Sequence, residues 1–155
     1  LLMDNYARLG LPEQITEMTI PAYSADPEDE DIQAELLCGV YRTFFSHPSM
    51  EAIIYWNVVD GYAFNAQPGD ATAGENRYFG GLLRFDMSEK PAYKKLKKMI
   101  NEEWHTEAEV PVLNGKASFR GFYGGYDVNV IDGDKEYPAK IDLSKEKKNE
   151  FTLTV

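Results

Sequence analysis

Glu17 is the acidic residue whose position best suits catalysis. It lies within residues 14–20, a short stretch rich in β-branched residues that Pro21 ends. A carboxylate among apolar neighbours is costly unless it has a partner or a task. In parallel α/β proteins the carboxyl ends of strands point into the active site. Glu17 is therefore a candidate catalytic carboxylate. An edge-strand glutamate that points to solvent is the alternative, and both remain open.

Trp56 is the second candidate, near the end of the apolar run of residues 52–59. Flat aromatic faces stack on the apolar faces of sugar rings, so a tryptophan beside a carboxylate suits carbohydrate chemistry. A lone tryptophan in an apolar run more often fills the core. Asn57 and Asp60 follow it, and they could hydrogen-bond hydroxyl groups or only order the turn.

A long loop rich in Gly, Asn, Asp and Ala runs from Asp60 to about Gly81. Loops of this length are usually functional or disordered. The aromatic residues in it, which include Tyr62 and Phe64, favour a function. Glu75 lies in the same loop with Arg77 nearby, and we interpret the two as a surface ion pair.

The elements that must position these residues alternate between strand and helix. The patterns predict strands over residues 14–20 and 52–59 and helices from Asp26 to about residue 46 and over 89–104. This βαβα order implies a parallel sheet covered by helices. The continuous apolar run predicts a second strand that is buried on both faces. Two strands are too few for such a sheet, so further strands are required. The apolar face expected for the first helix comprises Ile32, Leu36, Val40 and Phe44, flanked by Leu37, Tyr41 and Phe45.

The chain after His105 has a different pattern, with short segments of alternating polarity. Strands are predicted at residues 117–122, 126–130, about 137–143 and about 150–155. Glycine-rich turns separate them, and Asp132-Gly133-Asp134 is interpreted as a hairpin turn and not as a calcium loop. We therefore expect two domains, an α/β part over residues 1–104 and a small antiparallel β extension over residues 105–155.

Composition excludes several classes of function. The 155 residues contain 16 basic and 26 acidic side chains, which gives a net charge of −10, so no nucleic-acid partner is expected. No apolar run approaches the roughly 20 residues that cross a bilayer, so no membrane partner is expected. One cysteine, Cys38, excludes an internal disulfide and a cysteine-based zinc site, and two histidines leave little for metal chemistry or a histidine-driven triad. Cys38 is interpreted as a core residue, and the opening Leu1-Leu2-Met3 suggests a piece of a longer chain.

Three segments in fixed order carry a resemblance to a known family. They are Gln14–Met18, Tyr55–Tyr62, and Gly80–Asp86 continued by Lys90–Tyr93. Together they resemble the C-terminal part of glycoside hydrolase family 10, the endo-β-1,4-xylanases, over about residues 1–104. The tail resembles the β extension that follows the barrel in some members.

The resemblance implies a fold and a chemistry. The fold would be the C-terminal part of a (β/α)8 TIM barrel, with strands seven and eight and their helices. Glu17 then matches the nucleophile, and Trp56 matches the tryptophan that lines the sugar site. Phe64 stands where the family often has a further tryptophan. The resemblance implies a secreted enzyme with xylan or xylo-oligosaccharides as substrate and no cofactor.

The chain has no counterpart of the family's acid/base glutamate on strand four. Retaining hydrolysis needs two carboxyl groups about 5–5.5 Å apart. We therefore expect an inactive chain by itself, completed by a complementary N-terminal half as a separate chain or by self-association. A non-catalytic carbohydrate-binding or structural fragment is the alternative.

Overall fold

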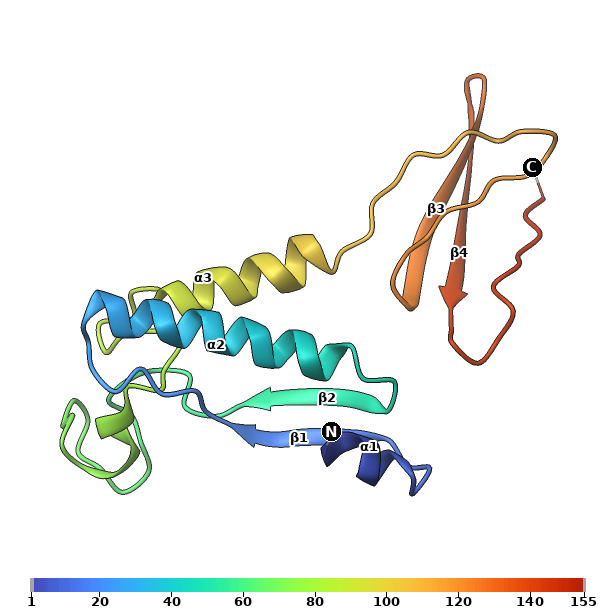
Figure 1. Ribbon diagram of the computed structural model, residues 1–155. Coiled ribbons are helices and arrows are strands. Elements are labelled where there is room, and N and C mark those ends of the chain that lie inside the picture. The colour runs from blue at the N-terminus through green and yellow to red at the C-terminus, as the bar shows by residue number, and fades with distance from the viewer. Residues whose placement is uncertain (1, 155) are drawn as a thin grey trace. The chain divides into compact units, whose positions relative to one another are not determined.

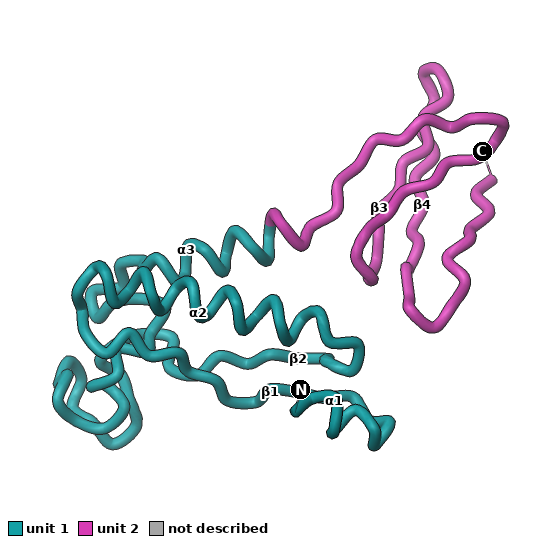
Figure 2. The backbone as a smooth tube through the Cα atoms, viewed as in Figure 1, with its two compact units in different colours: residues 1–101 teal, residues 102–155 magenta. Residues whose placement is uncertain are grey.

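The computed structural model describes residues 2–154, which form two compact units, residues 2–101 and 102–154 (Figure 2). Residues 2–101 begin with a helix that the sequence patterns did not indicate, α1 (Leu2–Ala7). The remaining elements that begin in this unit are β1 (Glu13–Met18), α2 (Pro27–Phe45), β2 (Met50–Tyr55), the 3-10 helix η1 (Gly74–Tyr78), α3 (Pro91–Lys98) and the π-helical turn η2 (Met99–Glu103) (Figure 1).

The two strands pair in parallel, as predicted, with Ile15 opposite Ile53 and Met18 opposite Tyr55. Helix α2 connects them and lies over one face of the pair, and α3 packs beside α2 (Figure 1). The predicted strand–helix–strand order therefore holds, with strands shorter than expected. The second predicted helix is α3, which ends at Lys98 and continues into η2.

The core of this unit lies between α2 and α3. Pro27 occupies the first turn of α2, and Glu28 and Asp29 complement the positive end of the helix dipole there. Asp26 is the N-cap residue, but its side chain makes no capping hydrogen bond. The buried apolar side chains of the two helices include Ala34, Leu37, Cys38 and Tyr41 of α2 with Ala92 and Leu96 of α3.

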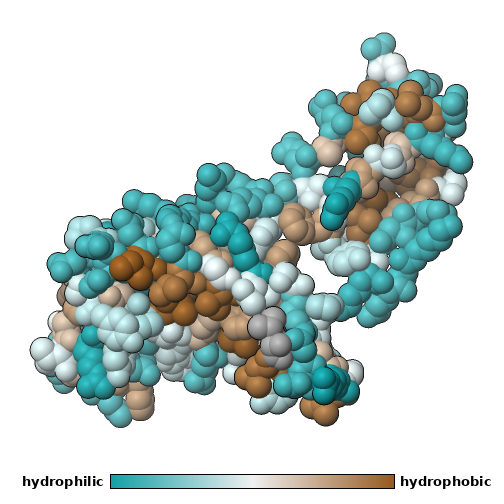
Figure 3. Space-filling model, viewed as in Figure 1, coloured by the Kyte–Doolittle hydropathy of each residue, from teal (hydrophilic) through white to brown (hydrophobic). Residues whose placement is uncertain are grey.

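The buried face of α2 differs from the predicted one. Ile32 and Leu36 are more than half exposed, whereas Gln33 and Leu37 are fully buried. Figure 3 shows apolar residues at the surface over the helices of this unit. Periodicity located an apolar helix correctly, but it did not say which part of the wide apolar face the packing covers. In the same way β2 is not buried on both faces, since Ile54 is 49% exposed.

The described residues 102–154 contain one antiparallel hairpin, β3 (Gly124–Asp132) and β4 (Lys135–Leu143). Asp132 pairs with Lys135 across the turn, and Gly133 has a φ of 60°, so the predicted hairpin turn is confirmed. Alternate residues along both strands are partly covered on one face, and Phe119 packs edge-on against Tyr126. The predicted strands at residues 117–122 and 150–154 are wrong, because these residues pair with no strand; residue 155 lies outside the described residues.

Among residues 2–154, no helix has both the length and the apolar character needed to cross a membrane.

Candidate functional site

The parallel strand pair places Glu17 and Trp56 at adjacent strand ends. The backbone N–H of Trp56 donates to the carbonyl of Met18 at 2.8 Å, and the Thr19 hydroxyl donates to the carbonyl of Trp56 at 3.1 Å. Glu17 is exposed, and within the described chain its carboxylate makes no hydrogen bond or ion pair. The Glu17 carboxylate is therefore open to solvent, and burial among apolar neighbours gives no reason to assign it a task. Its position at the strand end remains the reason to consider it.

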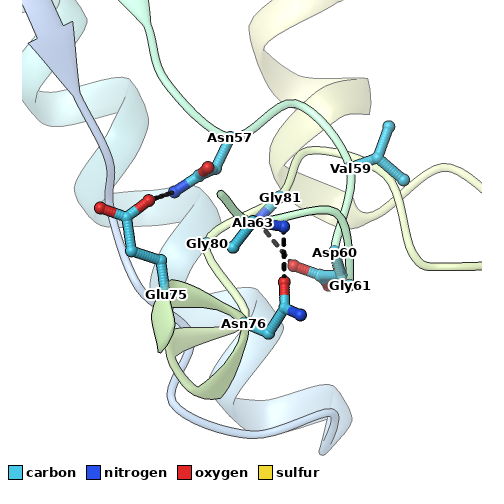
Figure 4. Close-up of a pocket in the computed structure, with 9 residues that line it drawn as sticks. All are labelled: Asn57, Val59, Asp60, Gly61, Ala63, Glu75, Asn76, Gly80 and Gly81. Carbon is cyan, nitrogen blue, oxygen red and sulfur yellow. Dashed lines mark hydrogen bonds between the residues drawn. The ribbon is translucent and has the colours of Figure 1, made fainter. Parts of the chain in front are cut away.

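Trp56 is 45% exposed, so it does not simply fill the core. Its indole Nε1–H donates to Oε2 of Glu75 at 3.3 Å. The side-chain amide of Asn57 donates to the same oxygen at 2.8 Å (Figure 4). Asn57 has a φ of 63°, a left-handed conformation that asparagine tolerates better than most residues. One carboxylate therefore holds two consecutive side chains that follow β2.

The interpretation of Glu75 and Arg77 as an ion pair is wrong. Arg77 donates from Nη2 to the Tyr78 hydroxyl at 2.7 Å, and its guanidinium lies 4.8 Å from the centre of that ring. No ion pair joins Glu75 to a basic residue within residues 2–154. Glu75 and Arg77 are close in sequence, but within η1 each side chain contacts a different partner.

Asp60 binds protein groups with both of its carboxylate oxygens. Oδ1 accepts the backbone N–H of Gly81 at 2.7 Å, and Oδ2 lies 3.0 Å from Nζ of Lys90. Lys90 also donates to the carbonyl of Phe79 at 2.8 Å. Of the two roles left open for Asp60, this geometry favours ordering of the turn over contact with a ligand.

The side chains of Gln33 and Tyr55 form hydrogen bonds to the backbone of residues 79–81. Gln33 is fully buried, and its Nε2 donates to the carbonyls of Ile20, Phe79 and Gly81 at 2.8–3.3 Å. The Tyr55 hydroxyl donates to the carbonyl of Gly80 at 2.7 Å and accepts the N–H of Ile20. Burial raises the pKa of Tyr55 to about 12. These contacts link the end of β1 to the loop that carries Glu75.

Two glycines make this close packing possible. A Cβ atom on Gly80 would lie 2.3 Å from Cγ2 of Thr19. A Cβ atom on Gly81 would lie 2.4 Å from the backbone nitrogen of Asp60. Both distances are below any real contact, so only glycine fits at either position without a shift of its neighbours.

The long loop is ordered by a buried asparagine. Asn76 accepts the N–H of Ala63 at 2.8 Å and donates to the carbonyl of Asp70 at 3.0 Å. Tyr62 stacks on Phe85 with ring centres 5.2 Å apart, and Phe64 is 83% exposed. Tyr62 therefore has an aromatic partner within the chain, whereas Phe64 presents its ring to solvent.

The structure thus brings Trp56, Asn57 and Glu75 together, with Glu17 on the adjacent strand. A small pocket lies among the residues after β2, η1 and the glycine pair (Figure 4); it is lined by Asn57, Val59, Asp60, Gly61, Ala63, Glu75, Asn76, Gly80 and Gly81. The sequence analysis named Glu75 but gave it the wrong partner, and it missed Asn76, Gln33 and Lys90 as parts of this region. Only Lys90 carried a signal, since it stands in one of the three segments of the family resemblance.

Within the described chain, no group of three or more His, Cys, Asp or Glu side chains is arranged to hold a metal ion.

Comparison with known proteins gives distant similarities that cover nearly the whole chain. The chain is 30% identical over 146 residues to the anti-sigma-I factor RsgI6 of Acetivibrio thermocellus, with 93% of this chain and 17% of that protein covered. It is 22% identical over 144 residues to endo-1,4-beta-xylanase 2 of Arabidopsis thaliana, with 92% of this chain and 12% of that protein covered. No protein-family model matches the chain.

Among solved structures, the chain is similar to xylanase 10B of Thermotoga petrophila, crystallised with xylobiose. The TM-score is 0.49 at 25% identity, with 65% of this chain and 30% of that chain covered. Of the two curated relatives, the anti-sigma-I factor and the plant xylanase, the chain spans less than a fifth of the length. Its similarity to endo-1,4-beta-xylanase 2 is a similarity to a segment of that protein.

Proposed function

We propose that the chain supplies the nucleophile side of a retaining endo-β-1,4-xylanase site built on the C-terminal part of a (β/α)8 barrel. The observation that carries this proposal is the parallel pairing of β1 and β2, which puts Glu17 and Trp56 at the ends of neighbouring strands. Similarity to endo-1,4-beta-xylanase 2 over 92% of the chain supports the substrate class, a β-1,4-linked xylan. A secreted location follows from this proposal, because the polymer cannot enter cells.

In this proposal the roles follow from the chemistry of each side chain. The Glu17 carboxylate attacks the anomeric carbon and forms a glycosyl-enzyme. Trp56 holds the sugar ring by stacking, while Asn57, Tyr62 and Phe64 make further contacts to the substrate. The acid that protonates the leaving oxygen comes from further barrel strands, either from a complementary N-terminal half or from a second copy. The open edges of the β1–β2 pair support the need for such strands.

The test is the variant Glu17→Gln in the full-length protein that contains this chain. The amide keeps the shape of the side chain but cannot attack, so hydrolysis of xylo-oligosaccharides is expected to fall to background while binding persists. Glu17→Gly with added azide is expected to release an α-glycosyl azide from an activated β-xyloside. Glu28→Gln, on the exposed first turn of α2, is the matched control and should leave turnover unchanged. Full activity of Glu17→Gln would remove Glu17 from the mechanism.

A second function is carbohydrate binding without turnover. The absence of turnover is favoured by the similarity of 93% of the chain to part of a protein named as an anti-sigma factor, a name that denotes a regulator. Carbohydrate binding is favoured by Trp56, which is 45% exposed. Turnover by the unmodified protein separates the two functions. If the unmodified protein binds xylo-oligosaccharides but releases no reducing sugar, the chain is a binding module and Trp56 is its contact residue.

A further inference from the structure

Glu75 makes the only hydrogen bond that the described chain offers to the Trp56 indole. A single oxygen, Oε2, accepts from the indole at 3.3 Å and from the Asn57 amide at 2.8 Å. The other oxygen, Oε1, has no partner among residues 2–154. Figure 4 shows the Glu75 side chain extending from η1 toward Asn57. The carboxylate therefore bridges the 3-10 helix and the segment that follows β2.

The backbone around Glu75 is fixed firmly enough for its side chain to position another side chain. Its neighbour Asn76 is buried, and it fixes η1 to the loop through the N–H of Ala63 and the carbonyl of Asp70. Lys90 and Gln33 hold the following segment through the carbonyl of Phe79. A side chain is a reliable guide for its neighbours only when its own backbone is fixed by packing and hydrogen bonds.

Trp56 needs such a guide because the chain covers the residue only in part. The residue is 45% exposed, so core packing alone does not fix its rotamer. Stacking on the apolar face of a sugar requires a defined ring plane. A hydrogen bond from the indole N–H to an ionised carboxylate is stronger than one to a neutral acceptor, and it fixes that plane.

We propose that Glu75 is a positioning residue that orients the Trp56 indole, together with the Asn57 amide, for stacking on the apolar face of a pyranose ring. The nature of the ligand rests on the function proposed above, whereas the orientation of the indole does not. A merely structural role fits less well, because Glu75 is exposed and its removal leaves no cavity.

The first experiment observes the indole directly in the full chain. The chain has two tryptophans, so a spectrum labelled at the indole nitrogen shows Trp56 with Trp104 as an internal reference. Glu75→Ala is expected to move the Trp56 indole proton upfield and to leave Trp104 unchanged. Glu75→Gln keeps a neutral acceptor and should give a smaller shift. Glu28→Ala, on an exposed position of α2, is the control and should move neither peak. An unchanged Trp56 peak in Glu75→Ala, with the backbone spectrum retained, overturns the proposal.

The second experiment measures xylobiose binding in a Glu17→Gln background, so that no turnover occurs. Loss of one charge-assisted hydrogen bond that orients the ring should raise Kd by about tenfold in Glu75→Ala and less in Glu75→Gln. A moved indole peak with unchanged Kd overturns the claim that this orientation serves ligand binding. A third outcome is that Glu75→Ala moves the Trp56 indole peak but the Glu17→Gln protein binds no xylobiose. This result supports the positioning role of Glu75 and contradicts the proposed function.

Discussion

The ammonium nitrogen of Lys90 lies 3.0 Å from Oδ2 of Asp60, and the Lys90 side chain is fully buried. The pair joins the residue before α3 to the turn after β2, and the same ammonium binds the carbonyl of Phe79. A buried ion pair of this kind tolerates the loss of one partner poorly, because the other charge stays in a medium that solvates it weakly.

Lys90→Met should therefore destabilise the chain strongly. The change leaves the Asp60 carboxylate buried without its cation, which costs on the order of 3–5 kcal/mol. Urea unfolding followed by circular dichroism measures the loss. Lys94→Met, at an exposed lysine of the same helix, is the control and is expected to change the free energy of unfolding by less than about 0.5 kcal/mol. Equal effects of the two changes would mean that the Lys90–Asp60 pair does not stabilise the fold.

The buried role of Lys90 shows where sequence reasoning stops. Local patterns predicted the parallel strand–helix–strand order, because Pro21 and the Ser46-His47-Pro48 stretch mark the ends of segments with clear periodicity. Lys90 precedes a lysine-rich helix, and nothing local distinguishes it from the exposed lysines that follow. Its burial depends on Asp60 and on the carbonyl of Phe79, which only the folded chain brings near it.

Gly80→Ala should destabilise the loop by overpacking. The new methyl would lie 2.3 Å from Cγ2 of Thr19, and a forced shift of this size costs about 1–3 kcal/mol. Thr19→Ser removes that methyl group and keeps the hydroxyl that donates to the carbonyl of Trp56. The double variant should therefore recover most of the lost stability in thermal melts.

Gly39 provides a matched control for this substitution. It lies within α2, and a Cβ atom there would meet nothing within 4 Å. Alanine in a helix interior is favoured over glycine by roughly 0.5–1 kcal/mol. Gly39→Ala should therefore stabilise the chain while Gly80→Ala destabilises it. The same sign for both changes would contradict the packing at Gly80.

The raised pKa of Tyr55 predicts a loss of stability at alkaline pH. Burial raises this pKa from 10.0 to about 12. The folded chain favours the neutral phenol, and this preference contributes to the free energy of unfolding. The contribution is complete below pH 10 and is lost as pH rises from about 10 to about 12. Two pKa units correspond to about 3 kcal/mol at most. Tyr55→Phe should start less stable, because it loses the bond to the carbonyl of Gly80. Its urea midpoint should then fall less than that of the unmodified chain between pH 9 and pH 11.5.

The candidate site was predictable only in part. The three sequence segments indicated Glu17 and Trp56, and the strand pairing puts them at the ends of adjacent strands. Glu75 was assigned to Arg77 because the two are close in sequence. Its actual partners are 18 and 19 residues away and follow a different element. Such contacts depend on how a long loop folds back, which local patterns do not encode.

The chain by itself is expected not to hydrolyse xylan. An unactivated sugar leaving group departs poorly without a proton donor, and retaining hydrolysis needs a second carboxyl group about 5–5.5 Å from the nucleophile. In residues 2–154, the carboxylate that contacts Trp56 is Glu75, and its Oε2 is occupied by two donors. Reducing-sugar release from xylan by the purified chain should therefore equal that of its Glu17→Gln variant.

An activated aryl β-xyloside separates the two catalytic roles in the same chain. Its leaving group departs without protonation, so phenol release requires the nucleophile but not the acid. Phenol release that depends on Glu17, together with no activity on xylan, is the expected pattern for a chain that supplies only the nucleophile. If xylan is hydrolysed above the Glu17→Gln background, an acid lies within the chain, and a chain that supplies only the nucleophile is ruled out.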